Sequence, residues 1–109
     1  ASVAVTDRDS VIAAAGSARR DLIGKRISPQ LEQIMEDRGI YRSSASERSV
    51  FVTESLDRYC ASVAAPIISE GDALGLVVFV GSEGSAPAGD TEYKLAQAIA
   101  GFLGKHMES

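Results

Sequence analysis

The sequence contains one cysteine, one histidine and no tryptophan among its 109 residues. Cys60 has no partner in the chain for a disulfide bond, which is typical of proteins in a reducing cytoplasm. A structural zinc site needs several Cys or His ligands at characteristic spacings, so this scarcity excludes one. His106 is expected near the end of the last helix, a poor position for the base of a nucleophilic triad. The sequence therefore predicts no enzyme activity and no cofactor.

Long apolar runs and an excess of positive charge are also missing. The longest apolar run, Leu74–Val80, is far shorter than the roughly 20 residues that a membrane-spanning helix needs. The formal net charge of -4 argues against direct binding to the DNA backbone, whose protein footprints are usually basic. No export signal is visible, and the chain begins at Ala1 rather than at Met. We therefore expect a single domain, cut from a longer protein whose partner domain lies outside residues 1–109.

Short apolar runs separated by turn residues predict the first elements. Ser2–Thr6 and Val11–Ala15 flank the polar cluster Asp7–Ser10, which is the pattern of a β-hairpin. A short helical turn is expected over residues 19–23. A longer helix follows, with Ser28 as its N-cap, Pro29 at its first position and Gly39 at its C-terminal stop. One face of that helix is apolar and is formed by Leu31, Ile34 and Met35.

The second half of the chain predicts strands and then a helix. Residues 41–48 are small and polar and predict a loop, whereas residues 49–53 predict a strand. Two apolar stretches between Tyr59 and Val80, joined at residues 70–72, predict a long hairpin, and a helix begins at Asp90 or Thr91. Because strands cluster and helices are segregated, we expect an α+β domain with an antiparallel sheet of about five strands. The terminal helix would cover one face, and short helices and loops the other.

The long hairpin is apolar on both of its faces. Strict alternation assigns Ala61 and Val63 to one face of the first strand and Ala64 to the other, and neither set is polar. An antiparallel sheet with one wet face should be polar there, so both faces must be covered. Pro66 lacks an N–H and indicates a bulge or a sheet edge at that point.

The face covered by loops is the place where the sequence predicts a cavity. Arg42, beside Tyr41 at the start of the loop, is able to bind an anionic metabolite through both arms of its guanidinium group. The remaining candidate ligand-binding residues are Phe51, Tyr59 and Cys60. Each has an ordinary alternative, because a loop arginine can simply be solvated and aromatic or cysteine side chains can simply fill a core.

The last helix has a wider non-polar surface than one buried face requires. Ala96, Ala100 and Gly104 form a row of small residues at a spacing of four, where another helix can approach closely. We expect this row to be an oligomer interface, with a partner helix from a second subunit or from a missing N-terminal segment. The alternative is that these residues are merely tolerated on a surface.

Several segments together resemble a GAF domain over nearly the whole chain: VAVTDRDSVIAAAG, DLIGKRIS and CASVAAPIISEGDALGLVVFV. With the ending DTEYKLAQAIAGFLGKHME, the chain is similar to the C-terminal domains of the stage V sporulation transcription regulators of endospore-forming bacteria. In that family the domain follows an N-terminal DNA-binding domain. The resemblance implies a sensory or oligomerising domain that acts as a dimer or tetramer through terminal helices and meets DNA only through the absent domain.

Two functions remain open from the sequence. In the first, a small effector binds between the sheet and the loop at residues 41–48 and shifts the helices of the oligomer. In the second, the domain only oligomerises, and its own side chains fill the cavity. Cysteine-dependent sulfoxide reduction and bilin attachment, known in other GAF branches, find no matching residues here, and no ligand can be transferred residue by residue.

Overall fold

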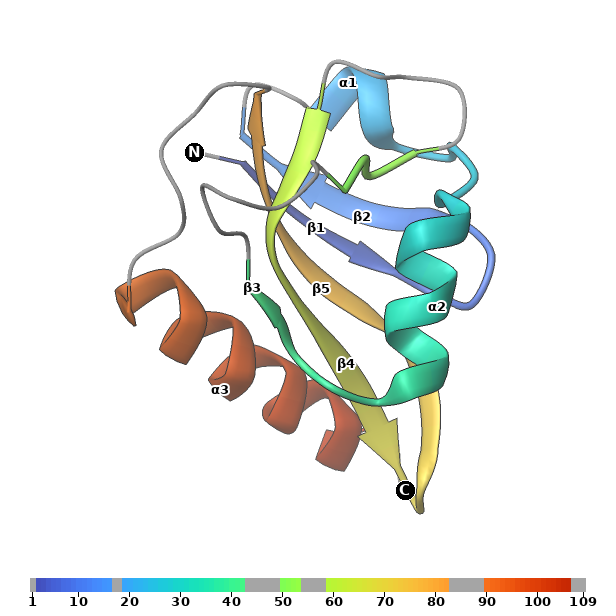
Figure 1. Ribbon diagram of the computed structural model, residues 1–109, viewed down its shortest axis with the longest axis vertical. Helices are drawn as coiled ribbons and strands as arrows, with labels where there is room; N and C mark the ends of the chain where they lie inside the picture. Colours follow the sequence, from blue (N-terminus) through green and yellow to red (C-terminus); the bar gives the residue numbers. More distant parts are fainter. Residues whose placement is uncertain (1, 17–18, 43–49, 54–58, 83–89, 107–109) are drawn as a thin grey trace.

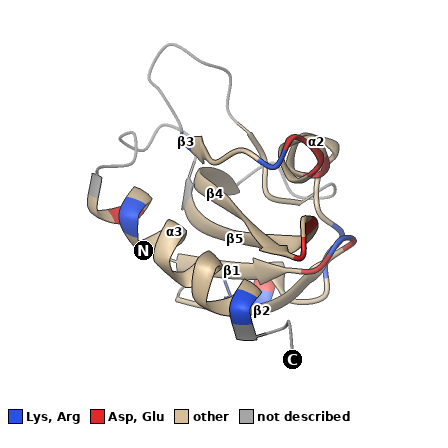
Figure 2. Cartoon of the chain, turned by 90° about the horizontal axis from the view of Figure 1, so that it is seen from below, with Lys and Arg blue, Asp and Glu red and all other residues tan. Residues whose placement is uncertain are grey.

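The computed structural model describes residues 2–16, 19–42, 50–53, 59–82 and 90–106 and has the predicted α+β architecture (Figure 1). Its elements are β1 (Ser2–Thr6), β2 (Val11–Ala15), α1 (Arg19–Leu22), α2 (Pro29–Asp37), β3 (Tyr41–Arg42), β4 (Tyr59–Ser69), β5 (Asp72–Ser82) and α3 (Asp90–His106). The five strands form one antiparallel sheet in the order β2-β1-β5-β4-β3. Figure 2 shows α2 and α3 on opposite sides of this sheet.

The turn between β1 and β2 is closed by an aspartate, as the polar cluster predicts. One carboxylate oxygen of Asp7 accepts hydrogen bonds from the backbone N–H groups of Asp9, at 2.7 Å, and Ser10, at 2.8 Å. These N–H groups, that of Ser10 first, stabilise the charged form and lower the pKa of Asp7 below its ordinary value. The bonds fix the position of Arg8, the residue between Asp7 and Asp9.

The β4–β5 hairpin turns at two residues with positive φ. Glu70 has φ 53° and Gly71 has φ 85°, and the flanking residues Ser69 and Asp72 are paired. Positive φ at both central positions is the geometry of a tight hairpin turn whose twist matches that of the strands. Glycine accepts this conformation readily, but the glutamate side chain makes it strained.

A β-bulge in β4 changes which residues share a face. The register shifts between Ala61 and Val63, so Ala61 packs on the same side as Ala64, while Val63 packs on the opposite side. The strict alternation expected for this strand is therefore wrong at Ser62, because a bulge puts two residues opposite one. Pro66 lies beyond the two residues of β4 that pair with β3, so it is at the sheet edge, as its missing N–H predicts.

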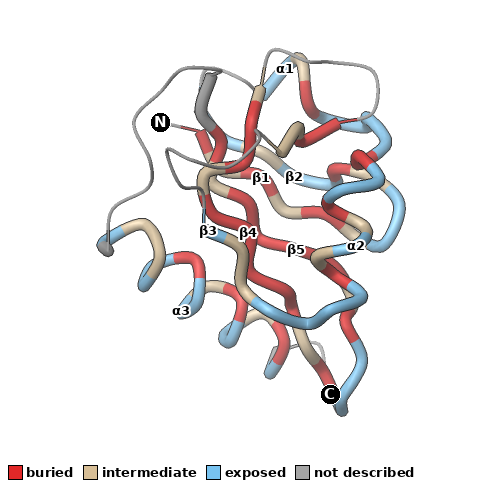
Figure 3. The backbone as a smooth tube through the Cα atoms, viewed as in Figure 1, coloured by how far each residue is buried: buried red, intermediate tan, exposed pale blue. Residues whose placement is uncertain are grey.

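Both faces of the central hairpin are buried, as the sequence predicts (Figure 3). On the side of α1 and α2, Ala64, Leu76 and Val78 are completely buried. On the side of α3, Val63 and Val77 are completely buried. The sheet therefore separates two apolar layers, and α3 closes one of them.

The start of α2 agrees with the sequence, and its end differs by one residue. The Ser28 hydroxyl accepts a hydrogen bond from the N–H of Leu31, as expected of an N-cap. The residue that leaves the helix with left-handed geometry is Arg38, φ 58°, and not Gly39. Two bonds from the Arg38 N–H, to the carbonyls of Ile34 and Met35, hold it in that conformation.

The fifth strand lies earlier in the chain than predicted. Tyr41 and Arg42, expected at the start of a loop, form β3 beside Ala64 and Val63. The strand expected over residues 49–53 is wrong for the described part, because Phe51 and Thr53 make only isolated bridges. The N–H and hydroxyl of Ser28 donate to the carbonyls of Val52 and Phe51 on one side of this segment. On its other side, backbone hydrogen bonds join it only to the first residues of β4, Tyr59 and Ala61.

Candidate functional site

The two residues of β3 point to different sides of the sheet, as alternation requires. Tyr41 is half-buried and packs on the apolar layer beneath α2. Arg42 is exposed, and its guanidinium carbon lies 5.6 Å from the centre of the Tyr93 ring on α3. The structure therefore separates these two candidates by the thickness of the sheet, and it connects Arg42 to the terminal helix.

The other three candidates lie together near the start of β4. Phe51 and Cys60 form an antiparallel bridge, and Cys60 is buried. The Tyr59 hydroxyl donates a hydrogen bond of 2.6 Å to Asp21, which ties α1 to the edge of the sheet. Tyr59 also packs on the same apolar layer as Tyr41, so these side chains have structural contacts of their own.

The layer beneath α1 and α2 is closely filled by the chain's own side chains. Leu22, Ile27, Leu31 and Val52 all have exposed fractions of 0%. Residues 43–48 of the predicted covering loop lie outside the described residues. Tyr41, Phe51, Tyr59 and Cys60 are not among the described residues that line either of two pockets found elsewhere on the domain.

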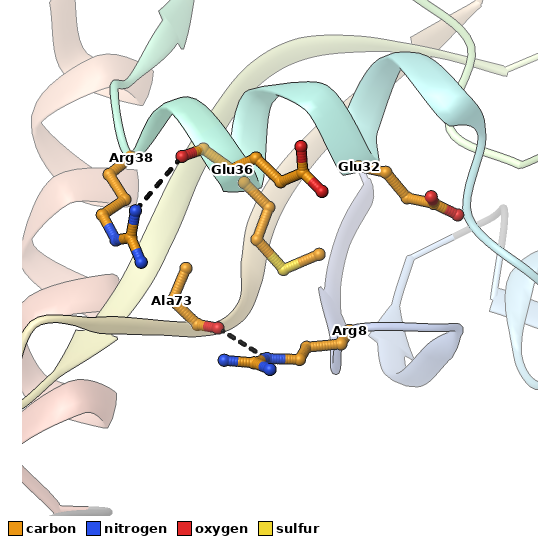
Figure 4. Close-up of a pocket in the computed structure, with 6 residues that line it drawn as sticks. Arg8, Glu32, Glu36, Arg38 and Ala73 are labelled. Atoms are coloured by element: carbon orange, nitrogen blue, oxygen red, sulfur yellow. Dashed lines mark hydrogen bonds between the residues drawn. The ribbon is translucent and has the colours of Figure 1, made fainter.

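The larger of these pockets, here named the α2 pocket, has a volume of about 460 Å³ (Figure 4). It opens between α2, the β1–β2 turn and the beginning of β5. Its lining residues are Arg8, Glu32, Met35, Glu36, Arg38 and Ala73. Sequence reasoning missed it because the turn, the helix and the hairpin meet only in the folded chain. The one available signal was the pair of glutamates spaced one helical turn apart on the polar face of α2.

Two arginines bind backbone carbonyls of the β4–β5 hairpin at this pocket. The Nε of Arg8 donates to the carbonyl of Ala73 at 3.0 Å, and the Nε of Arg38 donates to the carbonyl of Gly71 at 2.9 Å. Arg38 also lies 3.9 Å from the Asp72 carboxylate. The hairpin end is thus held from the β1–β2 turn and from the end of α2.

A smaller pocket of about 220 Å³ lies between α3 and the outer edge of β4. It is bordered by residues of both elements, including Ala65, Pro66 and Gln97, with Arg38 and Ile40 at one end. Its described lining is mostly apolar, and Arg38 is the one ionisable residue among the described residues that line it. This leaves the α2 pocket as the better equipped of the two for a charged ligand.

The row of small residues on α3 faces the sheet instead of a partner helix. Ala96 and Ala100 have exposed fractions of 0% and 4%. A Cβ added to Gly104 would lie 2.3 Å from the carbonyl oxygen of Ile68. The interface expected on Ala96, Ala100 and Gly104 is therefore corrected: in this fold the row lets α3 approach β4, and the large apolar residues exposed on α3 are Leu95 and Phe102.

The described residues carry little that is typical of a catalytic centre. They contain no group of three or more His, Cys, Asp or Glu side chains placed to hold a metal ion. Within the same residues, no helix is both long and apolar enough to cross a membrane.

Comparison with known proteins places the domain among transcription factors. Residues 1–108 match the family described as stage V sporulation protein T C-terminal, transcription factor. The chain belongs to this family. It is also 35% identical over 108 residues to stage V sporulation protein T of Bacillus subtilis (strain 168), an alignment that covers 98% of the chain and 59% of that relative. The chain thus spans well under two thirds of the relative's length.

Proposed function

We propose that the chain is the GAF-like regulatory domain of a cytoplasmic sporulation transcription factor, and that it binds a small effector and passes the signal to a separate DNA-binding domain. The observation that carries the proposal is the family match over residues 1–108. The alignment leaves about two fifths of the B. subtilis relative uncovered, which is ample for another domain. The net charge of -4 fits a domain that does not contact DNA itself.

The route for the signal leads from the covering layer to α3. Tyr41 contacts the layer beneath α2, and its neighbour Arg42 contacts Tyr93 on α3. A ligand that binds one arrangement of this layer more tightly shifts the population towards it. Because β3 touches both sides of the sheet, such a shift reaches the terminal helix.

The signal acts on an oligomer that forms through α3. Thr91, Leu95, Ala98, Phe102 and Lys105 follow one another at alternating spacings of four and three, and all are exposed. This spacing is that of a coiled-coil seam. Figure 2 shows that the charged residues of α3 lie towards its ends, with none between Lys94 and Lys105. The middle of this stripe, Leu95, Ala98 and Phe102, is apolar and fits the same helix of a second copy.

The oligomer is tested by light scattering on two matched variants. Phe102 exposes 69% of its surface on α3, and Ile12 exposes 51% of its surface on β2. Phe102→Glu should convert the dimer to monomer, and Ile12→Glu should leave it intact. Equal dissociation of both variants, or of neither, would count against α3 as the interface.

A second candidate function is oligomerisation without an effector, and a specific observation favours it. Leu22, Ile27, Leu31 and Val52 are completely buried, so the chain's own side chains pack closely in the part of the layer beneath α1 and α2 that lies outside the α2 pocket. A thermal-shift screen with nucleotides, amino acids and organic acids separates the two functions. A ligand present at 100 times its dissociation constant adds roughly 2.7 kcal/mol of stability. If no metabolite raises the melting temperature, the domain is structural only.

A further inference from the structure

The α2 pocket surrounds an apolar floor with charges of both signs. Arg8 and Arg38 contribute two positive charges, and Glu32 and Glu36 contribute two negative charges. The floor is made by the nearly buried residues Met35 and Ala73. The pocket volume of about 460 Å³ lies within the range of roughly 300–1,000 Å³ that is usual for small-molecule sites.

The Arg8 side chain is positioned to bind an anion. Its Nε is bonded to the carbonyl of Ala73, and its backbone is fixed by the turn that Asp7 closes. Its two terminal nitrogens make no hydrogen bond or ion pair with the described residues. A guanidinium group held at one edge and open at the other is suited to a carboxylate, and little side-chain entropy is lost on binding.

Arg38 has a different role, because two of its side-chain nitrogens donate hydrogen bonds and the third lies near a carboxylate. Its Nη1 donates to the carbonyl of Glu36 at 3.4 Å (Figure 4). Its Nη2 lies 3.9 Å from the Asp72 carboxylate. With its Nε bonded to Gly71, this side chain forms a wall of the pocket. The open anion receptor is therefore Arg8.

The carboxylates of Glu32 and Glu36 are positioned to bind a cation. They lie one turn apart on α2, so their carboxylates project from the same face of the helix. Neither carboxylate makes a hydrogen bond or ion pair with the described residues. Two like charges at this spacing repel each other, and an ammonium group between them relieves the repulsion.

We propose that the α2 pocket binds a small zwitterion, a free amino acid or dipeptide, with its carboxylate on Arg8 and its ammonium group on Glu32 and Glu36. The side chain of the ligand packs on Met35. A dianion would meet the two glutamate carboxylates, and a dication would meet the two arginines, so a ligand with one charge of each sign fits best. This inference rests on the proposed function, whose effector it assigns to a chemical class.

A ligand in the α2 pocket affects the β4–β5 hairpin, which α3 covers. The carbonyls of Gly71 and Ala73 are held by the two arginines of the pocket, and Gly104 of α3 lies against Ile68 in the same hairpin. A ligand bound to Arg8 therefore fixes one end of the hairpin on which the terminal helix rests.

The test is isothermal titration of the 109-residue chain with a panel of the common amino acids and of dipeptides. A member that binds is then compared with its N-acetylated and its C-amidated derivatives. Each derivative lacks one charge and should bind about 10- to 100-fold more weakly, the usual effect of losing a charge-assisted hydrogen bond. Absence of binding by the whole panel at millimolar concentration, or equal binding of the blocked derivatives, overturns the proposal.

Three variants locate the binding in the protein. Arg8→Gln and Glu36→Gln should each weaken the same ligand about 10- to 100-fold. Arg20→Gln removes an exposed arginine on α1 and should leave the affinity unchanged. Because Glu36 is exposed on α2 and its carboxylate makes no bond with described residues, its variant stays folded even if Arg8→Gln does not. If Glu36→Gln binds the ligand with unchanged affinity, the assignment of the binding site to the α2 pocket is wrong.

Failure of the zwitterion proposal can be distinguished from failure of the proposed function. A nucleotide or organic acid that raises the melting temperature equally in the original chain and in Glu36→Gln overturns the zwitterion site and leaves an effector-binding domain in place. If no metabolite of any class raises the melting temperature, both the zwitterion site and the effector-binding function are wrong.

Discussion

The guanidinium carbon of Arg42 lies 5.6 Å from the centre of the Tyr93 ring, so a cation–π contact joins β3 to α3. The two residues belong to elements separated by the long hairpin in sequence. Tyr41, the neighbour of Arg42, packs on the other side of the sheet. This short strand is therefore a physical connection between the two apolar layers.

The first prediction concerns the energy of that connection. Arg42→Met and Tyr93→Leu should couple by about 0.5–1 kcal/mol in a double-mutant cycle, the usual strength of a cation–π contact near the surface. Urea denaturation of the four proteins in the cycle measures it. Arg20→Met paired with Tyr93→Leu is the control and should show no coupling. A coupling of zero for Arg42 and Tyr93 would mean that β3 and α3 are not energetically joined there.

The second prediction concerns pH and the turn between β1 and β2. The pKa of Asp7 is held below its ordinary value of 3.8 by the N–H groups of Ser10 and Asp9. A carboxyl group whose pKa is lower in the folded state stabilises the fold above the unfolded pKa, and this contribution is lost as the pH falls through the folded value. Stability should therefore decrease with acid below about pH 4.

Asp7→Asn provides the check on that pH dependence. It should cost roughly 1 kcal/mol at neutral pH, because two hydrogen bonds lose their charged acceptor. The variant should also lose part of the decrease in acid. Parallel pH profiles for the two proteins, measured by urea denaturation, would show that the turn carboxylate is not responsible.

The third prediction concerns the strained hairpin turn. Glu70 has φ 53°, a conformation that costs an ordinary side chain roughly 1–2 kcal/mol. Glu70→Asn should therefore raise stability by about 0.5–1 kcal/mol, because asparagine tolerates this region better. The melting temperature measures the change. A neutral or destabilising effect would mean that the glutamate has a favourable contact that offsets the strain.

The sequence predicts this fold where local chemistry decides it. Asp7 closes its turn and Ser28 caps its helix through bonds to residues within three positions in the chain. The hairpin is apolar on both faces and therefore requires a cover on each. Those signals are local, and the structure confirms them.

The candidate site follows from the sequence far less completely. The bulge at Ser62 reverses the facing of part of β4, and no local residue signals it. Arg8 and Glu36 lie 28 positions apart and meet only because the hairpin end brings the turn beside α2. The row from Ala96 to Gly104 is compatible with contact to a helix or to a sheet, and only the packed structure distinguishes them.

The last prediction uses two glycines of α3 that sit in opposite surroundings. A Cβ on Gly104 would lie 2.3 Å from the Ile68 carbonyl oxygen, whereas a Cβ on Gly101 would meet nothing within 4 Å. Gly101→Ala should therefore stabilise the protein by about 0.5–1 kcal/mol through helix propensity alone. Gly104→Ala gains the same propensity but forces α3 away from β4, and overpacking of this kind costs roughly 1–3 kcal/mol. Urea denaturation should give opposite signs for the two variants. If both are stabilising, α3 does not rest on the sheet at Gly104, and that small residue becomes available for contact with a partner helix.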